Sequence, residues 1–188
     1  GDFHGAGGEW RVEPPRVAWP ILDAFREAAA QTGIPKIDDF NRGDNEGCGY
    51  CQVNQRRGIR WHAAKAFLKP VQSRPNLQVR TGALVTGLAF EGDRCTGVAY
   101  RHGGGERVAA AQGEVVLAAG AIGTPVLLQL AGIGPAEVLA GHGIPLRLDM
   151  PGVGANLQDH LQIRLVYKVR NALTMNTRAA SLWGKAAM

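Results

Sequence analysis

The chain has 188 residues and a formal net charge of +5, with 45% hydrophobic and 20% charged residues. This composition is typical of a globular protein with one large domain or two small ones, and it excludes a collagen, a coiled coil and a disulfide scaffold. Glycine is the exception, because 26 glycines are roughly twice the usual share. They lie between apolar runs, which favours close approach of the backbone to another group over disorder.

The basic residues are scattered, with one loose cluster that contains Arg56–Arg57, Arg60, Lys65 and Lys69. Few aromatic residues lie among them, so we expect no nucleic-acid partner. The simplest interpretation is a solvated basic face, although part of this charge could lie near a phosphorylated ligand.

The three cysteines, Cys48, Cys51 and Cys95, are an odd number. A closed set of disulfides is therefore not expected, and a reducing, cytoplasmic location is the better interpretation. Cys48 and Cys51 have the CxxC spacing, but neither a second pair nor well-spaced histidines accompany them, so we expect no metal site.

An uncharged stretch covers 115–136 and is long enough to cross a bilayer as a helix. Glycines and prolines interrupt it, and we expect a strand, a turn and a short helix there instead. Association with a membrane surface stays open.

The first part of the chain, 1–74, is expected to consist of loops and two helices. Apolar residues recur at helical spacing over 21–29, and Gly33 should end this helix. The segment 36–55 is rich in Asp, Asn and Gly and is expected to be a loop. A shorter helical pattern spans 60–68.

Short strand-like runs separated by tight glycine turns predict an antiparallel meander in the next part of the chain. The runs are 77–80, 83–90, 96–102 and 107–111.

Beyond the meander we expect a buried strand followed by two helices. The continuous apolar run 115–119 is typical of a parallel strand that is buried on both faces. Thr124–Pro125 should be the N-cap and first residue of a helix that is apolar on nearly every side and is therefore expected to be buried. A short helix over about 135–142, a turn-rich segment over 152–159 and a strand over 163–169 should follow.

The strand, glycine turn and helix over Val115–Leu130 form the most informative local feature. A helix N-terminus offers free backbone N–H groups and a positive dipole end, which suit a dinucleotide or phosphate. The small residues Ala118, Ala119, Gly120 and Gly123 would let an extended ligand lie against the backbone. The glycines could equally serve only to let the helix pack closely on the strand. The usual GxGxxG fingerprint with a following acidic residue is absent from this sequence.

Other catalytic motifs, among them GxSxG, GxxxxGK[ST] and HExxH, do not occur in the sequence. The adjacent Asp159 and His160 would point to opposite faces of a strand, so we expect a capping carboxylate and a surface histidine rather than a catalytic pair. These residues therefore indicate no catalytic constellation of a known type.

Five stretches together resemble the glucose–methanol–choline (GMC) oxidoreductase family, in its choline-dehydrogenase-like branch. The stretch 120–134, GAIGTPVLLQLAGIG, is similar to the second signature of the family, with Ala131 in place of the usual Ser. His62 stands where Ser or Thr is expected, which puts a helix-capping role of that position in doubt. The other similar stretches are DDFN at 38–41, QRRGIRW at 55–61, RPNLQVRTG at 74–82 and PGVGANLQDH at 151–160.

The resemblance implies an α/β fold that comprises part of a Rossmann-like FAD-binding domain with an antiparallel β-meander, plus the start of a substrate-binding domain. Residues 1–74 would be a helical and loop segment of the FAD-binding region, 75–160 its meander and returning strand and helix, and 161–188 the start of the substrate-binding domain. We expect the GxGxxG of the family before this sequence and a histidine-bearing domain after it.

The resemblance also implies FAD as the cofactor and a small-molecule alcohol as the substrate. The implied reaction oxidises a CH–OH donor: a hydride passes from the alcohol carbon to the flavin N5, and a histidine accepts the hydroxyl proton. None of the five histidines matches that catalytic position. The alternative is a non-catalytic piece that at most binds a partner.

Particular residues would bind the cofactor according to this resemblance. Val85 would lend its backbone to the adenine, Ala118–Gly120 would run past the cofactor, and Gly123 would belong to the same approach. The turn with Asn156 and Asp159 would complete the site and lead toward the substrate-binding domain.

Overall fold

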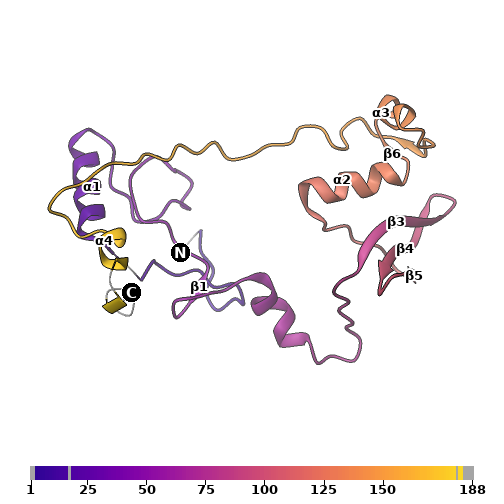
Figure 1. Ribbon diagram of the computed structural model, residues 1–188, viewed down its shortest axis with the longest axis horizontal. Coiled ribbons are helices and arrows are strands. Elements are labelled where there is room, and N and C mark those ends of the chain that lie inside the picture. The colour runs from indigo at the N-terminus through magenta and orange to yellow at the C-terminus, as the bar shows by residue number, and fades with distance from the viewer. Residues whose placement is uncertain (1–2, 17, 181, 184–188) are drawn as a thin grey trace. The chain divides into compact units, whose positions relative to one another are not determined.

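The computed structural model describes residues 3–16, 18–180 and 182–183. The chain divides into two compact units (Figure 1). The first unit comprises Gly1–Gln78 and Leu165–Met188, and the second comprises Val79–Arg164. The functional domain bounds expected at 74/75 and 160/161 stay a prediction.

Helix α1 (Pro20–Gln31) opens the regular structure of the first unit and confirms the helix expected there. Its C-terminus is a Schellman motif, in which Gly33 N–H donates to the Ala30 carbonyl at 3.1 Å and Ile34 N–H donates to the Ala29 carbonyl at 3.0 Å. Gly33 has a φ of +91°, a conformation that other residues rarely adopt. The predicted glycine stop is therefore confirmed.

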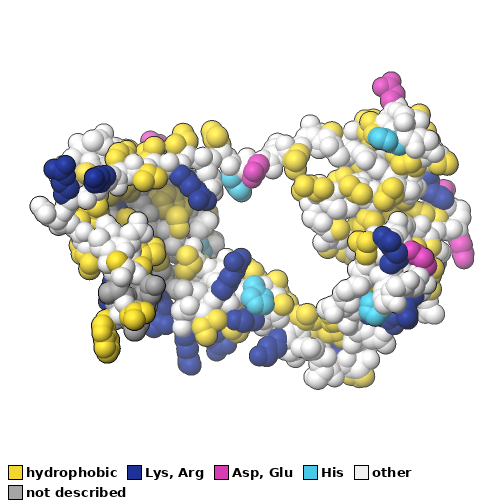
Figure 2. Space-filling model, viewed as in Figure 1, with side chains coloured by type: hydrophobic (Ala, Val, Ile, Leu, Met, Phe, Trp, Pro, Cys, Tyr) yellow, Lys and Arg dark blue, Asp and Glu magenta, His cyan; other side chains and the backbone are white. Residues whose placement is uncertain are grey.

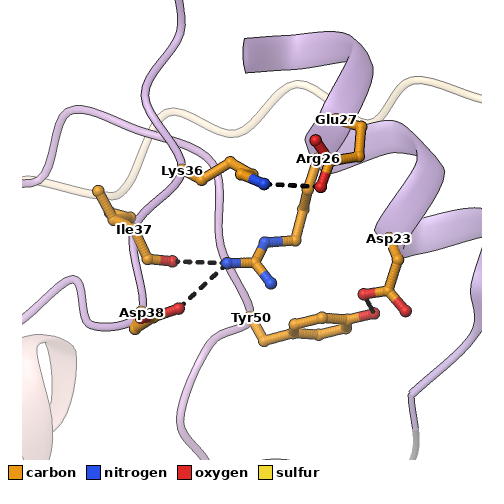
Figure 3. Close-up of polar contacts among 7 residues, drawn as sticks. All are labelled: Asp23, Arg26, Glu27, Lys36, Ile37, Asp38 and Tyr50. Carbon is orange, nitrogen blue, oxygen red and sulfur yellow. Dashed lines mark hydrogen bonds and ion pairs between the residues drawn. The ribbon is translucent and has the colours of Figure 1, made fainter.

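Polar contacts hold α1 on the loop that follows it (Figure 3). Arg26 Nη2 donates to the Ile37 carbonyl at 3.3 Å and to Asp38 Oδ1 at 3.2 Å, and the guanidinium lies 5.4 Å from the centre of the Tyr50 ring. The Tyr50 hydroxyl donates to Asp23 Oδ1 at 2.9 Å. Desolvation, and then this bond to Asp23, raise the pKa of Tyr50 above its ordinary value.

A two-residue hairpin follows the loop where we expected the start of a helix. It joins β1 (Gln55–Arg56) to the antiparallel β2 (Ile59–Arg60). Arg57 and Gly58 have φ values of +54° and +81°, as a type I′ turn requires. The helix predicted over 60–68 is therefore wrong at its beginning, because strand pairing takes Arg60.

The helical part of that segment is shorter than expected and is not α-helical. A π-helical turn, η1, spans Ala64–Leu68, and a 3₁₀ turn, η2, continues over Lys69–Val71.

Near the C-terminus a short helix, α4 (Met175–Ala179), begins with a capping box between Thr174 and Thr177.

The second unit contains the predicted antiparallel meander. It consists of β3 (Leu84–Glu91), β4 (Arg94–His102) and β5 (Gly105–Ala110), which pair in that order. Tyr100 on β4 is 5% exposed and accepts a hydrogen bond from Arg80 Nη1 at 2.7 Å. The strand expected over 77–80 is absent, because no described strand pairs with this segment, and Arg80 contacts the meander through its side chain.

The rest of the second unit is a small α/β arrangement. Helix α2 (Gly120–Leu130) leads to β6 (Ile133–Gly134), which pairs in parallel with β7 (Leu148–Asp149). Between these strands lies α3 (Ala136–Gly141), which confirms the short helix expected there. Its Leu139 is 1% exposed and is the largest fully buried side chain among the described residues.

Two predicted strands do not form. The run 115–119 has no strand pairing, and Val116 is 76% exposed. The segment 163–169 is likewise without strand pairing, and Val166 is 93% exposed. A strand exists only through hydrogen bonds to a neighbouring strand, and none of the described residues supplies one beside either segment.

Helix α2 also differs from the expectation in its start and in its burial. It begins at Gly120, and Pro125 lies inside it, because Gly120 with a φ of +83° already turns the chain into the helix. None of its residues is buried, and Ile122 is 71% exposed. An apolar helix is buried only where other elements cover it, and among the described elements α2 contacts chiefly β3 and β6.

Candidate functional site

The N-terminus of α2 exposes a run of small residues. Ala118, Ala119 and Gly120 are all exposed, so their backbone is accessible from solvent. A Cβ added at Gly120 would meet nothing within 4 Å. The left-handed φ of Gly120 thus explains the glycine locally, while the open space in front of it leaves room for a ligand.

Thr124 and Gly123 shape this turn from inside the helix. The Ala119 N–H donates to Thr124 Oγ1 at 3.1 Å, so one backbone donor at the turn is already satisfied. A Cβ at Gly123 would lie 3.1 Å from the Ala119 Cβ. Gly123 is therefore explained by close packing within the turn, while the remaining N–H groups and the positive end of the dipole stay available to an anion.

A cavity of about 500 Å³ lies between α2 and the turn at 152–158. Gln129 closes one side of it, since its Nε2 donates to the Val153 carbonyl at 3.2 Å. Asn156, one of the predicted site residues, lines the cavity and has a φ of +57°. The full lining is Ala121, Ile122, Pro125, Val126, Leu128, Gln129, Gly152, Val153, Gly154, Ala155, Asn156, Leu157 and Gln158.

Glycine is required where this turn approaches the helix. Gly154 has a φ of +83°, and a Cβ there would lie 2.9 Å from Gln129 Nε2. The turn can therefore approach α2 closely only because this residue has no side chain.

The two remaining predicted residues do not line the cavity. Val85 is half-buried on β3, which is an outer strand of the meander and so has one edge without a paired strand among the described residues. Asp159 is exposed, and its Oδ1 accepts from the N–H of His160 at 2.8 Å. The structure thus places Asn156 in a cavity with α2. Asp159 accepts from a neighbouring backbone N–H, and it does not cap a helix as we expected from the sequence.

Sequence reasoning missed Gln129 and the apolar face of α2 that includes Ile122 and Pro125. Gln129 could have been noticed, because it is a long polar side chain in an otherwise apolar helix. Its partner Val153 could not, because only the folded turn places that carbonyl beside the helix.

The cavity offers room for a ligand, but its own side chains cannot move a proton near neutral pH. None of its lining residues has an ionisable side chain. General acid–base catalysis needs a titratable group within hydrogen-bond reach of the reacting atoms.

The cysteines form neither a disulfide nor a metal site within the described part of the chain. Cys48, Cys51 and Cys95 are all free thiols. No group of three or more His, Cys, Asp or Glu residues is arranged to hold a metal ion there.

The comparisons with known proteins place these features in one family. Residues 8–162 match the model of the GMC oxidoreductase family. The chain therefore belongs to the GMC oxidoreductases, and the expected family is confirmed.

Curated relatives of the chain include choline dehydrogenases. The mitochondrial choline dehydrogenase of Homo sapiens is 41% identical over 93% of this chain and 30% of its own length. The oxygen-dependent choline dehydrogenase of Burkholderia thailandensis is 39% identical over 93% of this chain and 31% of its own length. The chain thus spans about a third of the length of these relatives.

Solved structures show the same relationship. Pyridoxine 4-oxidase from Mesorbium loti has a TM-score of 0.72 and 37% identity, over 79% of this chain and 29% of its own. An FAD-dependent oxidoreductase from Chaetomium thermophilum has a TM-score of 0.75 and 33% identity, over 81% of this chain and 27% of its own. The fold is therefore a mixed α/β arrangement that matches part of these flavoenzymes.

Within the described residues, no helix combines the length and the hydrophobicity needed to cross a bilayer.

Proposed function

We propose that this chain forms part of the FAD-binding region of an FAD-dependent oxidoreductase that acts on CH–OH donors. The observation that carries the proposal is the open backbone at Ala118–Gly120, where α2 begins, in a chain of the GMC family. Exposed small residues beside a helix N-terminus suit an extended, phosphate-bearing cofactor.

The residues present fit FAD. Nothing within 4 Å fills the space where a Gly120 Cβ would stand, so a cofactor could contact the backbone of Ala118–Gly120. Val85 would bind the adenine through the backbone of its strand, because one edge of β3 is unpaired among the described strands. Asn156 and Asp159 would contribute polar side chains from the turn facing α2 and from the segment after it.

Membership of the family supports a CH–OH donor as the class of substrate. The similarity to choline dehydrogenases supports the narrower proposal that the substrate is a choline-like alcohol. The redox chemistry would come from FAD itself, while the protein supplies binding, orientation and the exclusion of water. The cavity beside α2 suits that supporting role because its lining is mostly apolar. We assign no catalytic residue in this chain.

A second candidate function is a non-catalytic binding piece. It is favoured by the absence of any ionisable side chain from the cavity lining. The two proposals differ in one property that can be measured directly, which is whether the chain binds FAD.

The test is a titration of the purified chain with FAD, followed by flavin absorbance and fluorescence. The chain should bind FAD, and Gly120→Leu should weaken binding at least tenfold, because its side chain would enter the open space before α2. Gly103→Leu is the matched control: Gly103 also has a positive φ and open surroundings, but it lies in the β4–β5 turn. No binding with FAD in excess would leave the non-catalytic proposal standing.

A further inference from the structure

A second cavity lies in the first unit and has a different character. Its volume is about 480 Å³, and it is lined by Gly8, Glu9, Arg11, Arg56, Trp61, Lys65, Ala66, Lys69 and Pro70. Four of these residues are cationic and one is a carboxylate. Figure 2 shows Lys and Arg side chains gathered on this face of the first unit. We call this cavity the basic pocket.

The cations of the basic pocket are poorly neutralised. Within the described residues, no carboxylate lies within 4 Å of the charged groups of Arg56, Lys65 or Lys69. Arg11 reaches Glu13 at 3.7 Å, close to the limit for an ion pair. The four cations outnumber the single carboxylate of Glu9, and a concave surface with an excess of positive charge concentrates anions.

The backbone brings the two lysines to the same side. Lys65 lies in the π-helical turn η1, and Lys69 begins η2 four residues later. Both lysines line the same pocket, so a bound anion would be attracted by both of their charges. Lys65 is held further by donating from Nζ to the Arg60 carbonyl at 3.1 Å.

Trp61 supplies a fixed aromatic wall. Its Nε1 donates to the Glu9 carbonyl at 2.8 Å, and the Arg56 guanidinium lies 5.2 Å from the ring centre. These contacts orient the ring and one cation together. A ligand with an anionic group and an organic body would thus meet cations and an apolar surface in one pocket.

We propose that the basic pocket binds a phosphate group. A phosphate carries up to two negative charges and several acceptor oxygens, which suit two lysines and two arginines. The pocket is concave and of limited volume, which fits a small phosphate ester or a lipid headgroup rather than a nucleic-acid strand. All its lining residues belong to the first unit, whereas the proposed FAD-binding residues belong to the second. The inference therefore does not rest on FAD binding.

The test is a calorimetric titration of the purified chain with pyrophosphate, with sodium chloride of equal ionic strength as the reference. Lys65→Gln and Lys69→Gln should each weaken binding at least fivefold. Lys168→Gln removes the same charge from an exposed lysine outside the pocket and should change the affinity less than twofold. In a ¹H–¹⁵N spectrum, the Trp61 indole signal should shift with the same dissociation constant.

Vesicles that contain phosphatidic acid identify the source of the phosphate. Vesicle binding that both pocket variants reduce would indicate a lipid headgroup, and pyrophosphate binding without vesicle binding would indicate a soluble ester. Both outcomes support the phosphate pocket. Pyrophosphate binding no stronger than chloride, or an equal loss in Lys168→Gln, would overturn it. The FAD titration of Lys65→Gln should match that of the unchanged chain, so the two proposals can fail separately.

Discussion

Among the glycines of the second unit, Gly132 should be the one whose replacement by alanine lowers the free energy of unfolding most. It follows α2 with a φ of +82°, and a Cβ there would lie 2.4 Å from the Pro145 carbonyl oxygen and 3.1 Å from the Arg147 nitrogen. Its own carbonyl accepts from the N–H of Arg147 at 2.8 Å. Gly132→Ala would therefore combine backbone strain with a collision against the segment that enters β7.

Gly143 offers a matched comparison, because it also follows a helix, α3, in the left-handed conformation. Its φ is +67°, but a Cβ there would meet nothing within 4 Å. The left-handed region costs an alanine roughly 1–2 kcal/mol, offset in part by the lower entropy of the unfolded chain, so Gly143→Ala should destabilise by about 1 kcal/mol. Overpacking adds about 1–3 kcal/mol, so Gly132→Ala should cost about 2–4 kcal/mol.

The assay combines urea unfolding, followed by circular dichroism, with hydrogen exchange at the Arg147 amide. Gly132→Ala should lower the free energy of unfolding by at least about 1 kcal/mol more than Gly143→Ala does. Exchange at Arg147 should accelerate only in Gly132→Ala, because that amide donates to Gly132. Equal losses within about 0.5 kcal/mol in the two variants would refute the collision as the cause.

Two further predictions concern the core and the pH dependence. Leu139→Ala removes the most buried large side chain and should destabilise the second unit by about 2–5 kcal/mol in urea unfolding; a loss below about 1 kcal/mol would show that this side chain is not packed as described. The pKa of Asp39 lies below its ordinary value of 3.8. The main cause is the N–H of Asn41, which donates to Asp39 Oδ1, and the second is the hydrogen bond between His4 Nε2 and Asp39 Oδ2 at 2.5 Å. A carboxyl group whose pKa is lowered in the folded protein adds stability at pH values above its pKa in the unfolded chain. This contribution is lost as the pH falls through the pKa of the group in the folded protein. The carboxyl carbon of Asp39 should therefore titrate with a midpoint below 3.8 in an NMR titration, and a midpoint at or above 3.8 would contradict the contact.

Several elements could be predicted from the sequence because their signals are local. The helical spacing over 21–29 and the glycine at 33 define α1 and its end within one short stretch of chain. The meander was predictable for the same reason, since its strands are consecutive and tight turns join them. The family also followed from motifs that are contiguous in the sequence.

The candidate site was predictable only in part. The exposed small residues at Ala118–Gly120 lie together in the sequence, so their shared position at the start of a helix was foreseeable. The meeting of Asn156 with α2 was implied by resemblance alone, because more than 20 residues separate it from Gln129 and only folding brings the two to one cavity.

Local residue patterns thus predicted a helix with a clear end, a consecutive meander and membership of the GMC oxidoreductases. The folded chain shows in addition that 115–119 and 163–169 form no strands, and that α2 begins at Gly120 with its apolar sides exposed. One cause explains each of these differences. A glycine turn or a helical period acts over a few residues, whereas strand pairing and burial depend on neighbours that a local pattern cannot specify.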